Sequence, residues 1–114
     1  MPYLKIQTNQ TTTPDQARAL ISKASQLVAS ELGKPEQYVM VALSPPVPMV
    51  FAGTDAPTAY LELKSIGLPA SRTGDLSQAL CTLIENQLAI SKERVYIEFA
   101  DAPRAMWGWN GSTF

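Results

Sequence analysis

The two halves of the chain repeat one pattern of apolar residues at helical spacing. The apolar positions of a first predicted helix recur 56 residues later in a second, where Leu20, Ala24, Leu27, Val28 and Leu32 correspond to Leu76, Leu80, Leu83, Ile84 and Leu88. The connectors after the two helices also correspond, Glu36-Gln37 with Glu93-Arg94, at an offset of 57. Strand-like runs flank each helix at the spacing that a crossover helix requires. We therefore predict two βαβ units in tandem, each right-handed and with two parallel strands.

The first unit has clear boundaries. Residues 3–7 are predicted to form a strand, and a polar loop follows. Thr13 is a suitable N-cap, Pro14 suits the first helical position, and Gln16 completes a capping box with Thr13. Gly33 is expected to end this helix, because glycine readily adopts the left-handed conformation of a helix C-terminus.

The strands that follow are marked by apolar runs and by prolines. Residues 38–43 are almost wholly apolar and β-prone, which is typical of a strand covered on both faces. The prolines of residues 45–48 end this strand, and residues 49–51 are expected to pair only briefly. Residues 58–65 alternate well enough to predict the next strand.

The second unit repeats the order of the first. Its helix is expected to begin at about Asp75, with Gln78 three residues later as the partner in a capping box. Residues 95–99 are the last full strand that the pattern predicts. A tail of residues 101–114 follows and carries both tryptophans.

These elements predict the fold class α/β (α+β) for a single domain over residues 1–114. Two such units make a four-stranded mixed sheet with two helices, which we expect on one face. The other face is then bare, yet residues 38–43 have no polar side to turn toward water. We therefore expect another copy of the chain to cover it.

The composition excludes several functional classes. The formal net charge is −1 and no basic run is present, so nucleic-acid binding is not expected. Histidine is absent, which excludes Ser-His and Cys-His pairs and most transition-metal sites. The single cysteine, Cys81, is expected to be a buried thiol. No leader and no apolar run of membrane-spanning length is seen, so we expect a cytoplasmic protein without membrane contact.

The chain opens with Met1-Pro2, which is the first candidate for chemistry. If Met1 is removed, Pro2 carries a secondary amine, and an ordinary terminal amine titrates at about pKa 7.7–8. A base poised near the working pH suits proton transfer, and apolar surroundings or a nearby cation lower its pKa further. Met-Pro openings also occur in many unrelated proteins. While Met1 is attached, the nitrogen of Pro2 is an amide and cannot act as a base.

Other residues with chemical potential are spread along the chain, and each has a structural alternative. Lys34 can hold an anion and depress the pKa of an amine, or simply offset the dipole of the preceding helix. A free backbone N–H in the segment Ser65-Ile66-Gly67 can bind a substrate oxygen. The structural alternative is that this segment only marks the end of a strand. Tyr96 and Glu98 lie on one face of the last strand, where both can belong to a site. The structural alternative is that Tyr96 is a half-buried aromatic residue and Glu98 a solvated or paired carboxylate. The segment Trp107-Gly108-Trp109 offers a flat apolar wall or a cap on the core.

Several short motifs occur together in one order along the whole chain. They are Pro2, Thr8-Asn9, Gly33-Lys34-Pro35, Gln37-Tyr38, Ser65-Ile66-Gly67, Ile90-Ser91, Arg94-Val95-Tyr96-Ile97, Gly108-Trp109-Asn110 and Ser112-Thr113-Phe114. In this set the chain resembles the macrophage migration inhibitory factor family of the tautomerase superfamily. The resemblance implies a symmetric homotrimer with three sites at the subunit interfaces, removal of Met1, and keto–enol tautomerase activity toward phenylpyruvate-like 2-keto acids without any cofactor or metal.

The resemblance also implies roles for individual residues. Pro2 would be the catalytic base and acid, moving the proton between carbon and oxygen. Lys34 and the turn at Ser65 and Ile66 would hold the carboxylate and oxygens of the substrate. The turn would do so through the backbone N–H of Ile66. An aromatic wall would be formed by Tyr38, Trp107, Trp109 and Phe114, together with Tyr96 of the adjoining subunit.

The sequence departs from the family pattern at three places. Glu98 stands where the family more often has asparagine, so a carboxylate replaces a donor beside the expected pocket. Trp107 replaces a smaller aliphatic residue and is expected to narrow the pocket mouth. Residues 57–60 lack the Cys-x-x-Cys of the family, so thiol–disulfide chemistry is not expected. Two other hypotheses stay open: a non-catalytic signalling or receptor-binding protein, for which the resemblance also implies non-classical secretion, and a structural trimer with a vestigial site.

Overall fold

The computed structural model describes all residues from Met1 to Phe114. Four main strands and two helices follow one another as β1 (Tyr3–Thr8), α1 (Pro14–Leu32), β2 (Met40–Leu43), β3 (Ala59–Ile66), α2 (Thr73–Leu88) and β4 (Val95–Ala102). A two-stranded hairpin of β5 (Gly108–Trp109) and β6 (Ser112–Thr113) closes the chain.

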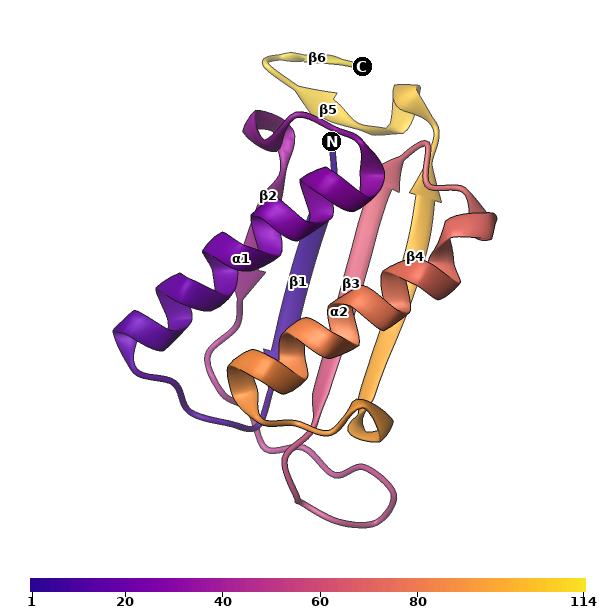
Figure 1. Ribbon diagram of the computed structural model, residues 1–114. Coiled ribbons are helices and arrows are strands. Elements are labelled where there is room, and N and C mark those ends of the chain that lie inside the picture. The colour runs from indigo at the N-terminus through magenta and orange to yellow at the C-terminus, as the bar shows by residue number, and fades with distance from the viewer.

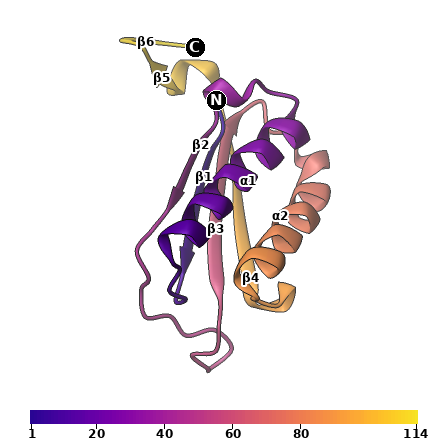
Figure 2. The ribbon, with the colours of Figure 1, turned by 60° about the vertical axis from the view of Figure 1, so that its left-hand side comes forward.

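The main sheet has the strand order β2-β1-β3-β4. β1 pairs with β2, and β3 with β4, in parallel, whereas the central strands β1 and β3 are antiparallel. Figures 1 and 2 show both helices on the same face of this sheet. The predicted tandem βαβ units and the mixed four-stranded sheet are thus confirmed.

Helix α1 begins and ends as its sequence predicts. The Thr13 hydroxyl accepts a hydrogen bond from the Gln16 N–H at 3.1 Å, and the Gln16 side chain accepts one from the Thr13 N–H at 2.9 Å. The helix ends at Gly33, whose φ of 63° is left-handed. Its inward face buries Leu20, Ala24 and Val28.

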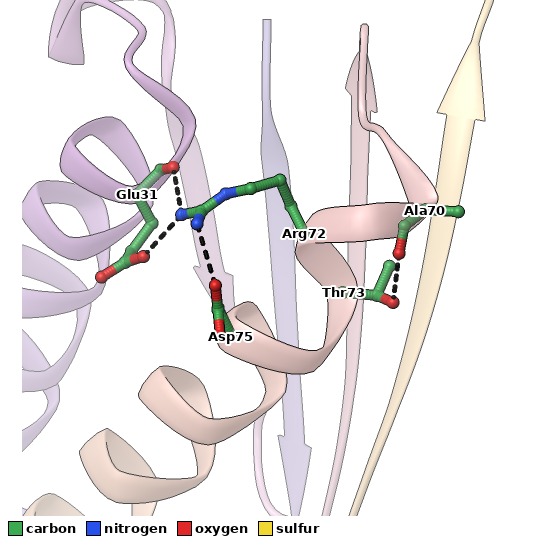
Figure 3. A network of polar contacts seen from close by, with 5 residues as sticks. All are labelled: Glu31, Ala70, Arg72, Thr73 and Asp75. Atoms are coloured by element: carbon green, nitrogen blue, oxygen red, sulfur yellow. Dashed lines mark hydrogen bonds and ion pairs between the residues drawn. The ribbon is translucent and has the colours of Figure 1, made fainter.

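The predicted start of α2 is wrong. The helix begins at Thr73 rather than Asp75, and the preceding residue, Arg72, makes no side-chain cap. The turn Ala70–Arg72 already brings the backbone into helical conformation, and the Thr73 hydroxyl donates to the Ala70 carbonyl at 2.9 Å. The Asp75 carboxylate is bound by the Arg72 guanidinium at 3.0 Å, so it does not cap the helix as predicted (Figure 3).

The predicted strand boundaries need smaller corrections. β2 begins at Met40, because residues Glu36–Tyr38 form a 3-10 turn. β4 continues to Ala102, three residues beyond its predicted end. Residues 49–51 do not pair as a strand, and only a bridge between Phe51 and Thr54 forms there.

The core lies between the helices and one face of the sheet. Alternate residues of the two central strands, Leu4, Ile6, Leu61 and Leu63, are fully buried there. They pack against the inward residues of α2, where Cys81 is also buried and unpaired, as predicted. Neither helix is both long and apolar enough to cross a membrane.

The opposite face of the sheet is polar at its centre. The intervening residues of β1 and β3 point away from the helices, and Lys5 pairs in register with Glu62. The Tyr60 hydroxyl lies 3.3 Å from both the Glu62 and the Glu98 carboxylates. On β2 itself every residue is apolar, and Met40 is 66% exposed. Polar side chains thus fill the centre of this face, and its cover by another copy of the chain stays a prediction.

Candidate active site

A cavity of about 220 Å³ lies where the N-terminus meets the C-terminal hairpin. Figure 1 shows these two parts of the chain at the same end of the sheet. The cavity is lined by Met1, Pro2, Tyr3, Gln37, Tyr38, Val39, Met40, Trp107, Gly108, Trp109 and Phe114. Five of the predicted site residues thus meet around one space, although they lie at opposite ends of the sequence.

Pro2 is buried at the base of this cavity. Its carbonyl accepts a hydrogen bond from the Met40 N–H at 2.9 Å, which extends the pairing of β1 with β2 by one residue. Proline has no N–H to leave unsatisfied in this buried position. Its ring is therefore fixed by its main chain, and its nitrogen stays at the cavity.

The terminal amine of the chain, carried here by Met1, is close enough to Lys34 to sense its charge. Partial burial lowers the pKa of this amine below its ordinary value of 8.0, and the positive charge of Lys34 lowers that pKa further. Both effects favour the neutral amine, which is the form that can accept a proton.

Lys34 owes its position to the end of α1. The left-handed Gly33 turns the chain, and the Lys34 N–H donates back to the Ala29 carbonyl at 3.0 Å. The Lys34 Nζ also lies beside Gly67, since a Cβ added to Gly67 would be 3.8 Å from it. The lysine thus joins the N-terminus to the turn after β3.

Ser65 and Ile66 are buried at the end of β3, next to that turn. The Ser65 hydroxyl donates to the Ile66 carbonyl at 3.0 Å, so it is already satisfied within the chain. Neither residue lines the cavity of this single chain. Lys34 does not line it either, although its charge reaches the terminal amine.

Three aromatic rings form one wall of the cavity. Tyr38 meets Trp109 edge to face, at a centroid distance of 5.7 Å, and meets Phe114 in the same way at 6.2 Å. Trp109 and Phe114 are stacked at 5.5 Å. The Phe114 N–H donates to the Trp107 carbonyl at 3.2 Å, which ties the last residue to the hairpin. The wall is a preformed apolar surface suited to a planar ring.

Tyr96 and Glu98 lie away from this cavity. Tyr96 is in register with Tyr60 and Glu98 with Glu62, toward the end of the sheet opposite Pro2. Tyr96 is 65% exposed. Within one chain these two residues do not join the others.

Sequence reasoning missed four lining residues, namely Tyr3, Gln37, Val39 and Met40. Their position follows from two signals in the sequence. Tyr3 comes directly after Pro2, and Gln37 and Val39 flank Tyr38. Met40 faces Tyr3 in the register of two parallel strands, which becomes evident only once the pairing is known.

A second, more open groove of about 630 Å³ contains none of the predicted residues. It lies along the proline-rich segment 46–50, with Asn9 and Asp55 at its side. No group of three or more potential metal ligands occurs in the structure. The Pro2 cavity is therefore the one that brings several predicted residues together, namely Pro2, Tyr38, Trp107, Trp109 and Phe114.

Comparisons with known proteins identify the family of the chain. The sequence model of the family described as macrophage migration inhibitory factor matches residues 1–114. The chain is 40% identical to a macrophage migration inhibitory factor homologue of Brugia malayi, over 100% of this chain and 99% of that one. It is 38% identical to the macrophage migration inhibitory factor of Mus musculus, with the same coverage.

Solved structures give the same result. The crystal structure of a macrophage migration inhibitory factor homologue from Prochlorococcus marinus superposes with a TM-score of 0.93 at 47% identity and covers 98% of both chains. The protein from Toxoplasma gondii also gives 0.93, at 34% identity, over 98% of this chain and 99% of that one. The chain therefore belongs to the macrophage migration inhibitory factor family, a family of tautomerase-superfamily cytokines.

Proposed function

We propose that this protein is a cofactor-independent keto–enol tautomerase of phenylpyruvate-like 2-keto acids, with Pro2 as general base and acid. One observation carries the proposal: a terminal amine of lowered pKa, influenced by Lys34, opens onto a cavity with an aromatic wall. A lowered pKa favours the neutral amine, which can accept a proton from carbon, and the wall accommodates the phenyl ring.

Removal of Met1 is part of the proposal. It turns the Pro2 nitrogen from an amide into a secondary amine, and it also vacates the part of the cavity that Met1 lines. Pro2 is more buried than Met1. The freed amine stays beside the same apolar residues and the same lysine, so we expect its pKa to be lowered for the same reasons.

The reaction moves one proton. The Pro2 nitrogen takes a proton from C3 of the 2-keto acid, and the electron pair of the broken C–H bond forms the enolate. The proton then passes to the enolate oxygen and leaves the nitrogen neutral. Lys34 opposes the negative charge of the carboxylate and enolate, and the Ile66 N–H binds an oxygen at the turn beside Lys34.

The full site requires a homotrimer in this proposal. Tyr96 is too far along the sheet to reach the cavity of its own chain, yet it is well exposed. In the trimer it extends the aromatic wall of the adjoining subunit and brings Glu98 near the same pocket. A carboxylate there disfavours an acidic substrate, so we expect Glu98 to reduce the affinity for phenylpyruvate.

The test is the decay of enol-phenylpyruvate absorbance, followed for the wild type and for Pro2→Gly. We expect a rate loss of about 10²-fold or more, because general base catalysis contributes that much. An insertion of alanine between Met1 and Pro2 is the stricter control, since it retains the ring but acylates its nitrogen. Intact mass confirms the terminus of each sample. Equal rates in all three proteins would remove the proposal.

A second candidate function is signalling without catalysis, which the name of the mouse relative supports. The two functions separate in one comparison. Macrophage migration is measured with the wild type and with Pro2→Gly, next to the enol assay on the same samples. Inhibition by both proteins would show signalling independent of the amine.

A further inference from the structure

The loop between β2 and β3 lies at the end of the sheet opposite the N-terminus (Figure 1). The guanidinium of Arg94 holds this loop. Arg94 Nε donates to the Pro57 carbonyl at 2.8 Å, and its Nη1 donates to the Phe51 carbonyl at 3.1 Å. Its Nη2 donates to the Ala56 carbonyl at 3.1 Å and to the Thr54 carbonyl at 3.4 Å. One side chain thus binds four carbonyls of the loop and fixes its path over β4.

Asn9 holds the same loop from β1. Its Nδ2 donates to the carbonyls of Asp55 and Ala56, both at 3.1 Å, and its Oδ1 accepts from the Thr58 N–H at 3.1 Å. The loop backbone is thus held from two sides, by Arg94 and by Asn9. The side chains that the loop carries are therefore held in place relative to the sheet.

Phe51 is the side chain that this arrangement fixes. Arg94 lies over the Phe51 ring, with 5.2 Å between Cζ and the ring centroid, in a cation–π contact. The Phe51 ring in turn meets Tyr96 edge to face, at a centroid distance of 4.7 Å and an interplanar angle of 71°. Arg94, Phe51 and Tyr96 therefore form a continuous row of contacts, which we call the Tyr96 clamp.

We infer that Phe51 and Arg94 are positioning residues that set the orientation of the Tyr96 ring and thereby the aromatic end of the substrate pocket. The inference deepens the proposed function, because it rests on Tyr96 contributing to the pocket of the adjoining subunit. Within its own chain the Tyr96 ring contacts the Phe51 ring, and this contact favours one rotamer of Tyr96 over the others. Holding the ring in place lowers the cost of ordering it on substrate binding.

The clamp predicts a specific kinetic pattern for Phe51→Leu. The variant keeps an apolar side chain but loses the ring edge, and the Pro2 amine is untouched. We expect KM for phenylpyruvate to rise about 3- to 10-fold, the range of one aromatic pair, with kcat unchanged within about twofold. Phe51→Tyr restores an aromatic edge and is expected to recover the wild-type KM. Val50→Thr, a neighbouring exposed position, is the matched control and leaves KM unchanged.

A double-mutant cycle shows whether Phe51 acts through Tyr96. If it does, the double variant Phe51→Leu/Tyr96→Leu has the same KM as Tyr96→Leu alone. If the two residues act independently, the fold-increases in KM of the two single variants multiply in the double variant. An unchanged KM in Phe51→Leu, with a raised KM in Tyr96→Leu, overturns the clamp and leaves the proposed function intact. Fold-increases in KM that multiply in the double variant overturn the clamp as well.

A ¹⁹F NMR measurement tests the clamp independently of catalytic activity. The protein is labelled with 3-fluorotyrosine, and the Tyr96 ¹⁹F signal is assigned through Tyr96→Phe. We expect Phe51→Leu to shift this signal and to leave those of Tyr3 and Tyr38 in place. An unmoved Tyr96 signal overturns the clamp whatever the kinetics. Full activity of Pro2→Gly overturns the proposed function instead, and with it the substrate role of the clamp.

Discussion

Gly33 and Ala89 occupy equivalent positions at the ends of the two helices, and both are left-handed, with φ of 63° and 56°. They lie 56 residues apart, the same offset as the apolar positions of the helices. The same turn is thus built twice, once with the residue that suits it and once with a residue that does not. A left-handed conformation costs an L-residue about 1–2 kcal/mol, whereas glycine adopts it freely.

Ala89→Gly is therefore expected to stabilise the protein. Relief of the strain outweighs the greater flexibility of glycine in the unfolded chain, and the expected gain in unfolding free energy is about 0.5–1 kcal/mol. Gly33→Ala should lower the unfolding free energy by about 1 kcal/mol for the converse reason. Urea unfolding at one fixed protein concentration measures both. Ala29→Gly inside α1 is the control and should destabilise, since glycine is a poor helix former.

The ion pairs of Arg72 are expected to contribute measurably to stability. Arg72 donates to both the main-chain carbonyl and the carboxylate of Glu31, at 2.9 and 3.0 Å, and joins the end of α1 to the start of α2 (Figure 3). The carbonyl is one that α1 leaves without a helical partner. Arg72→Ala should cost about 1 kcal/mol, because the side chains are partly exposed. Thermal unfolding at fixed concentration gives the value.

The surface pair of Arg18 and Asp15 provides the control. It lies three residues apart on α1 and is largely exposed, so Arg18→Ala should change stability by less than about 0.5 kcal/mol. Equal effects of the two substitutions would show that the bridge between the helices adds nothing beyond a surface pair.

Much of the fold was predictable because its signals are local. Thr13, Gln16 and Gly33 mark the ends of α1 within a few residues, and the repeat supplied the pairing of the strands. The start of α2 was missed because Asp75 binds Arg72, a contact that competes with capping. Sequence periodicity contains no information about that competition.

The candidate site was predictable only in part, for a physical reason. Pro2, Tyr38 and Trp109 meet because β1, β2 and the hairpin end together, and resemblance supplied that convergence rather than any local pattern. The role of Arg94 was invisible, because its partners lie 37 to 43 residues away in a loop without regular structure. Tyr96 is expected in the pocket of the adjoining subunit, with Glu98 beside it, and these placements stay predictions.

The Tyr60 hydroxyl should titrate above its ordinary value. Partial burial raises the pKa of Tyr60 above its ordinary value of 10.0, and the negative charges of Glu98 and Glu62 raise it further. Glu98→Gln removes one of these charges and should lower the pKa of Tyr60 toward 10.0. Absorbance titration of the phenolate, with Tyr60→Phe as the reference that identifies its signal, measures the shift. The same titration curve in both proteins would mean that Glu98 and Tyr60 are apart in solution.

The pH dependence of the reaction should move with Lys34. A neutral amine is the active base, so kcat/KM rises with pH through the pKa of the amine. Burial and the positive charge of Lys34 lower the pKa of the Met1 amine, and we expect them to lower the midpoint for Pro2 in the same way. Lys34→Gln removes a charge that disfavours the protonated amine, so the amine pKa rises and the acidic limb of the profile shifts to higher pH. KM for phenylpyruvate also rises, because the substrate carboxylate loses a cation. Lys23→Gln, on the exposed side of α1, should alter neither quantity. A profile that keeps its midpoint in Lys34→Gln would show that the lysine binds the anion without tuning the base.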